Sequence, residues 1–423
     1  MYVADSRASK APVSAEGAAR YAVAGRRRAA VAPTVLALGA VSLVTDVSSE
    51  MVTAVLPLYL VTGLGLSPLG FGLLDGIYNG FSALVRLVGG HLADRGGGRH
   101  KWVAGLGYGI SALCKPLLLV AQTLTPIGLI LAADRTGKGL RTAPRDALIS
   151  LASTPENRGR AFGVHRAMDT AGALLGPLVA FLILRATVDG YDAVFTVSFC
   201  VAVLGVLVLV LFVPGGRQEA GGGDGARPTL RAAVGLLRGR DLRRIAVCAL
   251  LLGLATVSDS FVYLLLQRRL GVPDRWFALL PLGTAAAFLL LAMPLGRLAD
   301  RVGRWAVFLA GHGALLVAYA LLLTSWHGTA LPYVVLALHG GFYAATDGVL
   351  MAAASEGVPE ALRSSGLAVV QTGQALARFA CSLLFGTAWT LWGDRAALAG
   401  AAGALLVCAV FSVVVRPKGA VAV

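Results

Sequence analysis

The sequence predicts an all-α integral membrane protein with twelve transmembrane helices in two pseudo-symmetric six-helix bundles. Three observations predict this fold: the composition, the spacing of the apolar runs, and an internal repeat near half the chain length. Of the 423 residues, 57% are hydrophobic and only 14% are charged, and the mean hydropathy is +0.75. A water-soluble protein of this size cannot bury so much apolar surface, so lipid is the expected solvent.

Twelve apolar runs are long enough to cross the hydrocarbon core as helices, which takes about 20 residues. A helix satisfies its own backbone hydrogen bonds, as lipid requires. In the first half the expected spans are 31–61, 70–92, 102–123, 126–150, 161–185 and 192–214. In the second half they are 244–267, 276–297, 304–325, 330–354, 364–390 and 394–415.

One long polar interruption, with the sequence GGRQEAGGGDGARP, reads as a flexible linker between the two halves. The first apolar run is too long for a cleavable signal peptide. The predicted organisation is a cytoplasmic N-terminal tail at 1–30, a six-helix bundle at 31–214, a cytoplasmic linker at 215–243, a second six-helix bundle at 244–415, and a cytoplasmic C-terminal tail at 416–423.

Basic residues gather in alternate connections, which gives the orientation. They lie in the N-terminal tail, 95–101, 158–160, the linker, 301–304 and Arg363, whereas 62–70 has none. The positive-inside rule therefore predicts a multi-pass protein of the plasma membrane with both termini in the cytoplasm. This clustering also accounts for the net charge of +15 without a nucleic-acid partner.

The sequence lacks the motifs of several catalytic classes. The five cysteines all lie in apolar runs without the short spacing of a metal or redox site. Neither a phosphate-binding loop nor H-E-x-x-H occurs. We therefore expect no catalytic residues, no metal site and no cofactor, and we expect the chain to act as a monomer in the lipid bilayer and not as an enzyme.

The two halves repeat each other at nearly equal offsets. LADRGGGRHKW, which begins at Leu92, recurs as LADRVGRW at Leu298, and TPENRGRAFG recurs loosely as VPEALRSSG. The acidic segment around Asp46 has a weaker counterpart around Asp259. Three matches separated by about half the chain indicate a duplicated six-helix unit.

The repeated loop resembles the signature G-x-L-A-D-R-x-G-R-K between the second and third helices of the major facilitator superfamily. The sequence GHLADR runs from Gly90 to Arg95 and GRLADR from Gly296 to Arg301, although the first copy has an extra glycine before its next Arg. The resemblance implies a small-molecule transporter with that family's fold. It also implies gating residues in the two loops: Gly90, Asp94, Arg95, Gly296, Asp300 and Arg301.

Two further motifs fit the drug/proton antiporters of this family. Arg135 opens an R-x-x-x-G motif in the fourth span, and the resemblance implies that it controls the protonation of a nearby carboxylate. The fifth span carries the spacing of the antiporter signature at Gly163, Gly172, Gly176 and Pro177, although Ala180 and Phe181 replace its final glycines. Small residues at this spacing allow close helix packing, and the motif favours export.

Charged residues inside apolar spans are costly unless they are paired or wet, so each is a functional candidate. Asp46 and Glu50 share one face of the first helix, and two close carboxylates resist simultaneous ionisation. Asp259 lies at a comparable depth in the other half. We expect these three to meet in one chamber. Further candidates are Asp75, Lys115, Asp169 paired with His165, Asp347 and Arg378.

These features favour a secondary active transporter that exports a small organic molecule by alternating access, with protons as the coupling ion. Two alternatives stay open: an uptake carrier, or an exporter of a metal ion or metal complex that uses the same carboxylates. A membrane sensor that does not transport is a further alternative from a different class. The sequence does not identify the substrate.

Overall fold

The computed structural model describes residues 31–95, 100–154, 157–188, 190–215, 235–325, 328–356 and 363–415. These residues are almost wholly helical and include no β-strand. The predicted all-α fold is therefore confirmed. Both predicted tails and most of the linker lie outside the described residues.

The first half contains six helical spans. They are α2 (Pro33–Leu58), which continues as the π-helical turn η1 (Tyr59–Gly63), then α3 (Pro68–Arg95), α4 (His100–Val120), α5 (Leu124–Leu151), α6 (Arg158–Ala186) and α7 (Gly190–Phe212). Pro33 begins α2, where its missing N–H costs nothing because the first turn has no partner for it. The observed helices begin and end within a few residues of the predicted spans.

The second half differs from the prediction in two spans, since 276–297 is also interrupted, between α11 and α12. Its elements are η2 (Leu236–Arg238), α9 (Arg240–Ala255), α10 (Asp259–Leu270), α11 (Asp274–Phe277), α12 (Leu280–Val302), α13 (Arg304–Leu323), α14 (Leu331–Glu356) and α15 (Arg363–Val414). The seventh span, predicted as one helix at 244–267, is broken between α9 and α10. The hydroxyl of Tyr319 stabilises the break by accepting the Val257 N–H at 2.8 Å.

The last two predicted spans both belong to α15. Gly393 has a φ of 85° inside this element, a left-handed value that glycine adopts without steric cost. The chain turns there, between the predicted spans 364–390 and 394–415. A single element with a sharp turn at one glycine therefore supplies two crossings.

Nine described helical segments are long and apolar enough to cross a membrane. These nine count α15 once and leave out α3 and α5, which have 28 residues each. Helix α5 is long enough to span but carries several charged residues, which interrupt its apolar surface. Counting α15 as two spans and adding α3 and α5 accounts for the twelve predicted spans within the described residues.

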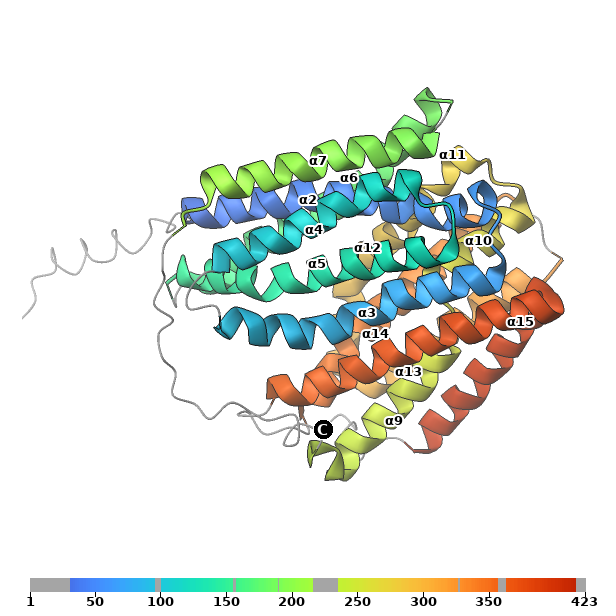
Figure 1. The fold of residues 1–423 in the computed structure, drawn as a ribbon. Helices are drawn as coiled ribbons and strands as arrows, with labels where there is room; N and C mark the ends of the chain where they lie inside the picture. The colour runs from blue at the N-terminus through green and yellow to red at the C-terminus, as the bar shows by residue number, and fades with distance from the viewer. Residues whose placement is uncertain are drawn as a thin grey trace, which may run out of the picture.

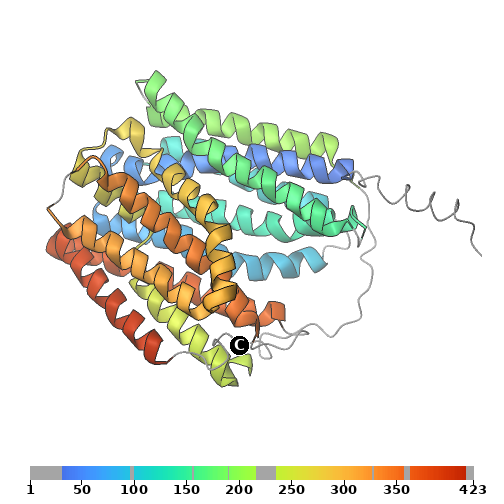
Figure 2. The same cartoon turned by 180° about the vertical axis from the view of Figure 1, so that it is seen from behind.

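Helices pack mainly within their own half of the chain. In the first half α2 packs on α6 and α7, α4 on α5 and α7, and α3 on α5. In the second half α14 packs on α12 and α13, and α15 on α9 and α13. The two halves lie side by side in both views (Figures 1 and 2). This packing supports the predicted domain boundaries, which stay a prediction.

The largest contact between the halves is the one between α3 and α15, and glycines allow it (Figure 1). A Cβ added to Gly72 would lie 2.5 Å from the carbonyl oxygen of Ser382, and one added to Gly386 would lie 2.5 Å from that of Pro68. The backbone N–H of Leu69 also donates to Thr390 Oγ1 at 2.9 Å. The two backbones therefore touch, as small residues permit in membrane helices.

Helix α6 packs on α2 at two of its three motif glycines. Gly172 lies against the backbone of Leu43, and a Cβ at Gly176 would lie 2.7 Å from the Cβ of Glu50 and 2.9 Å from the carbonyl oxygen of Val47. Nothing lies within 4 Å of the corresponding position at Gly163. The close packing expected of this motif therefore occurs at Gly172 and Gly176 only.

We expect Gly176→Ala to lower the free energy of unfolding by about 1–3 kcal/mol, because the added methyl group has no room between the helices. The measurement is the midpoint of thermal unfolding of the purified protein in detergent. Gly163→Ala is the matched control and should keep or slightly raise the midpoint, since alanine favours a helix. Equal midpoints for the two variants would contradict the observed helix contact.

Candidate functional site

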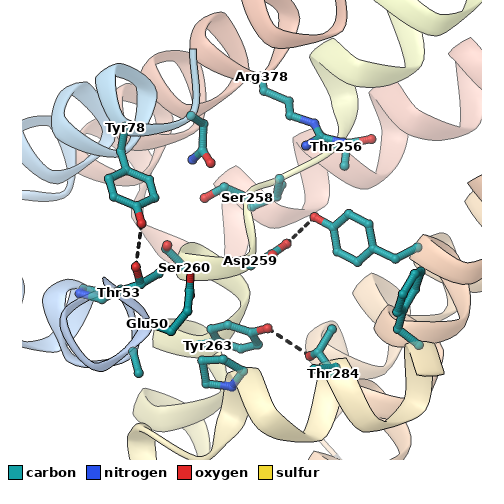
Figure 3. Close-up of a pocket in the computed structure, with 18 of the residues that line it drawn as sticks. Glu50, Thr53, Tyr78, Thr256, Ser258, Asp259, Ser260, Tyr263, Thr284 and Arg378 are labelled. Atoms are coloured by element: carbon teal, nitrogen blue, oxygen red, sulfur yellow. Dashed lines mark hydrogen bonds between the residues drawn. The ribbon is translucent and has the colours of Figure 1, made fainter. Parts of the chain in front are cut away.

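A cavity of about 380 Å³ lies between the two halves. The first half contributes side chains from α2 and α3, and the second half contributes the break before α10 together with α10, α12, α14 and α15 (Figure 3). The lining residues are Glu50, Thr53, Ala54, Pro57, Tyr78, Asn79, Thr256, Val257, Ser258, Asp259, Ser260, Tyr263, Pro281, Thr284, Ala285, Phe288, Tyr343, Asp347 and Arg378. Most are polar, which is unusual for surface buried between membrane helices.

Glu50 and Asp259 come from different halves and line the same cavity (Figure 3). Asp46 does not line it. Its carboxylate is buried within the first half, 3.1 Å from the guanidinium of Arg141. The expectation that all three carboxylates meet in one chamber therefore holds for Glu50 and Asp259 only, because a cation on α5 holds Asp46 away from it.

Asp259 is the first residue of α10, directly after the break in the seventh span. Its Oδ1 accepts hydrogen bonds from His339 Nε2 at 2.9 Å and from the Tyr343 hydroxyl at 2.5 Å. The side chain of His339 is fully buried, whereas that of Asp259 is 41% exposed. The start of a helix also favours a negative charge, so the break presents a carboxylate to the cavity.

Asp347 on α14 and Arg378 on α15 face each other across the cavity wall, 4.0 Å apart. Their side chains are 60% and 40% exposed. An ion pair this exposed contributes little to stability. Both groups therefore remain accessible to a solute.

The first half forms the opposite wall. Glu50 lies 3.7 Å from Lys138 Nζ, beyond a direct hydrogen bond, and its side chain is 27% exposed. Thr53 and Tyr78 share a hydrogen bond of 2.5 Å (Figure 3). The guanidinium of Arg135 stacks on the ring of Tyr78, 3.8 Å from its centroid.

Arg135 is paired with its chain neighbour Asp134, which the sequence analysis did not single out. Asp134 accepts from Arg135 at 2.6 Å and from Lys115 at 2.8 Å, and all three side chains are at most 10% exposed. Arg135 therefore pairs with none of the predicted carboxylates. The sequence could have identified Asp134, because it is an acidic residue inside the same apolar span as Arg135.

A second charge network joins α2, α5 and α6. Arg145 lies 3.1 Å from Asp146 and 3.6 Å from Asp169. His165 lies 2.9 Å from the hydroxyl of Ser42. Within the described residues, His165 and Asp169 are each in contact with a different helix, His165 with Ser42 of α2 and Asp169 with Arg145 of α5.

Asp75 is buried at the contact between α3 and α15, where it accepts a hydrogen bond from Ser382 at 2.6 Å. It does not line the central cavity, although it borders a much smaller one beside it. This carboxylate therefore belongs to the seam between the halves.

The predicted gating loops are described in part. Asp300 lies 3.5 Å from Arg304, one turn further along the chain, and not against Arg301. Gly296 has open space around it. Gly90, Asp94 and Arg95 lie in the last turns of α3, whose side chains are outside the described residues. The gating role stays a prediction.

Within the described part of the chain, no group of three or more His, Cys, Asp or Glu side chains could hold a metal ion. The arrangement gives the metal alternative no support. It instead offers a solute two accessible carboxylates on one wall, a third on the other, and several hydroxyl groups between them.

Comparison with known proteins identifies the family. The profile of the Major Facilitator Superfamily matches residues 38–382 and 277–422. An uncharacterised MFS-type transporter of Methanocaldococcus jannaschii is 29% identical over 379 residues, which cover 87% of this chain and 92% of that protein.

Solved transporters share the fold. The nucleoside transporter NupG has a TM-score of 0.77 at 15% identity, with 90% of this chain and 98% of that chain covered. A bacterial homologue of the human lysosomal transporter Spinster, in an inward-facing and unoccupied conformation, has a TM-score of 0.73 at 15% identity, with 90% and 96% covered. At such identities the likeness concerns the fold alone.

We expect Asp134→Ala to be among the most destabilising single changes in the first half. Removing one partner of a buried charge cluster costs about 3–5 kcal/mol, since the remaining charges lose their compensation. The measurement is the thermal midpoint in detergent, with Asp241→Asn as the control because Asp241 is half exposed and weakly paired. An Asp134→Ala midpoint equal to that of the control would contradict the stabilising role of this charge cluster.

Proposed function

The chain belongs to the Major Facilitator Superfamily, and we propose that it exports a small organic molecule in exchange for protons by alternating access. Transport follows from the family, whereas the substrate, the coupling ion and the direction are our proposal. One observation carries it: Glu50 and Asp259, from opposite halves, face one polar cavity. Carboxylates that both halves present to one cavity can exchange a proton for a solute.

The contacts between the halves suggest which side is closed. Besides the contact of α3 with α15, Phe71 packs on Phe261 with ring centroids 4.9 Å apart, and Phe181 packs on Trp276 at 5.0 Å. By the positive-inside rule these residues lie toward the outer ends of their helices. We infer that the outer side is closed and that the cavity opens toward the cytoplasm.

Separation of the halves would break few strong interactions. The ion pairs described above each join two residues of the same half, for example Glu50 with Lys138 and Asp347 with Arg378. The seam instead consists of backbone contacts at glycines, aromatic rings and single hydrogen bonds. Such a surface can open without separating an ion pair, which favours alternating access.

Glu50 is the group that best fits proton coupling. It is partly exposed to the cavity, and its nearest cation is Lys138 on α5. Protonation would remove the attraction between α2 and α5 at this point. A proton on Glu50 can therefore change both the charge of the cavity and the packing of its wall.

The antiporter-like helix supports export, because its Gly176 packs directly against Glu50. This contact connects the motif to the proposed coupling carboxylate. We propose that the protein lies in the plasma membrane and works as a monomer, and that both its termini face the cytoplasm, as the positive-inside rule predicts.

Glu50→Gln should abolish proton-coupled transport while leaving solute binding intact, because an amide keeps the shape of the side chain but takes up no proton. The measurement is solute-dependent proton movement across proteoliposomes, screened over a panel of small organic compounds with a pH-sensitive dye inside. Asp241→Asn serves as the control, since this residue lies outside the cavity. Persistent gradient-driven flux in Glu50→Gln would exclude Glu50 as the coupling site.

Direction can be measured in inverted membrane vesicles that contain the protein. If the protein exports, an acid-inside pH gradient should drive accumulation of the solute, and dissipation of the gradient should release it. Accumulation in right-side-out vesicles with an acid-outside gradient would instead identify an uptake carrier.

A further inference from the structure

Carboxylates outnumber cations among the side chains that line the central cavity, with Glu50, Asp259 and Asp347 against Arg378. Glu50 has Lys138 as its partner, and Asp347 has Arg378. Asp259 forms no ion pair with a described Lys or Arg: its two hydrogen-bond donors are His339 and Tyr343, and Arg378 acts on it only from a longer distance. If the ring of His339 is neutral, the cavity carries one negative charge that no protein cation in contact balances.

The surroundings of His339 agree with a neutral ring. Its Nε2 faces Asp259 Oδ1, whereas its Nδ1 is buried without any hydrogen-bond partner. A protonated imidazole needs a partner for both N–H groups, and burying one without a partner is costly. A neutral ring that donates from Nε2 leaves only a bare Nδ1 lone pair buried.

Asp259 also retains a free oxygen toward the cavity. Both of its hydrogen bonds to described residues go to Oδ1, so Oδ2 is available. The side chain of Asp259 is 41% exposed and lines the cavity together with several hydroxyl-bearing residues (Figure 3). An accessible carboxylate oxygen suits an ammonium group, which donates up to three hydrogen bonds.

The rest of the lining is suited to a hydrophilic body. Several hydroxyl protons are already donated within the wall, as from Tyr263 to Thr284 and between Thr53 and Tyr78, so their oxygens remain as acceptors. The apolar lining residues are small, apart from Phe288: Ala54, Pro57, Val257, Pro281 and Ala285. This surface offers hydrogen bonds to hydroxyl groups, and the rings of Phe288 and of three tyrosines supply its larger apolar contacts.

We propose that the transported solute is a small hydroxylated amine, with the chemistry of an amino sugar or an amino alcohol, whose ammonium group binds Asp259 Oδ2. The hydroxyl groups of the solute meet the Thr53 and Tyr78 wall. A cavity of about 380 Å³ suits a solute of sugar size. This inference rests on the proposed transport function and adds the substrate class.

The test is equilibrium binding to the purified full-length protein in detergent, by calorimetry and thermal shift. The probes are glucosamine, 2-amino-1,3-propanediol and 2-deoxystreptamine, each compared with its N-acetylated form, which lacks the positive charge. Tetraphenylphosphonium represents lipophilic cations. We expect at least one free amine to bind about tenfold or more tightly than its acetylated form, since a charge-assisted hydrogen bond is lost.

Two variants test this binding mode. Asp259→Asn should weaken binding of the amine about tenfold or more, and Thr53→Val, in the hydroxyl wall, by several-fold. Thr53→Val keeps the shape of the side chain and should fold even if Asp259→Asn does not. Asp241→Asn, outside the cavity, should bind the amine as the unmodified protein does.

Several results would overturn the proposal: no binding of any of the three amines, equal binding of the acetylated forms, tighter binding of tetraphenylphosphonium, or unchanged affinity in both cavity variants. Because binding is measured without a gradient, it is independent of coupling. Amine binding without proton-coupled flux would refute the export proposal alone, and coupled flux of an uncharged compound would refute the substrate class alone.

Discussion

The pairing of charges between neighbouring helices is the constraint on which this structure depends. In a bilayer an ionised side chain must find a partner or water, and α5 carries enough cations and acids to need several partners. It pairs through Asp134 with Lys115 of α4 and through Arg141 with Asp46 of α2. These contacts hold α2, α4 and α5 together, and they pair most of the buried charged side chains of the first half with one another.

The charges that this pairing leaves accessible define the cavity. Glu50 lies too far from Lys138 for a direct hydrogen bond. Asp259 accepts its two hydrogen bonds from the His339 ring and the Tyr343 hydroxyl, and neither donor is a Lys or Arg. A break in a membrane helix is tolerated where it lines a polar cavity, and the break before Asp259 does so. The same local irregularity therefore presents the carboxylate to the cavity.

The seam between the halves is built on a different principle from the bundles. Inside the first half, buried charges lock helices together, whereas α3 and α15 meet through glycine backbones and two hydrogen bonds, from Ser382 to Asp75 and from the Leu69 N–H to Thr390 Oγ1. Close packing of small residues is strong only while surfaces fit. Two rigid units joined by such a seam are suited to rocking against each other, and this division connects the distribution of charge to alternating access.

By itself the sequence determined the helical membrane fold and the position of nearly every span, because bilayer thickness sets the length of the apolar runs. The repeated LADR loops also indicated the family. It also identified Glu50 and Asp259 as charges that need an explanation. Only the tertiary structure decided which groups pair: Asp134 contacts Arg135, Asp46 contacts Arg141, and Asp259 contacts His339. Residues far apart in the chain compete for each charge, and the outcome depends on which helix faces bring them within hydrogen-bond distance.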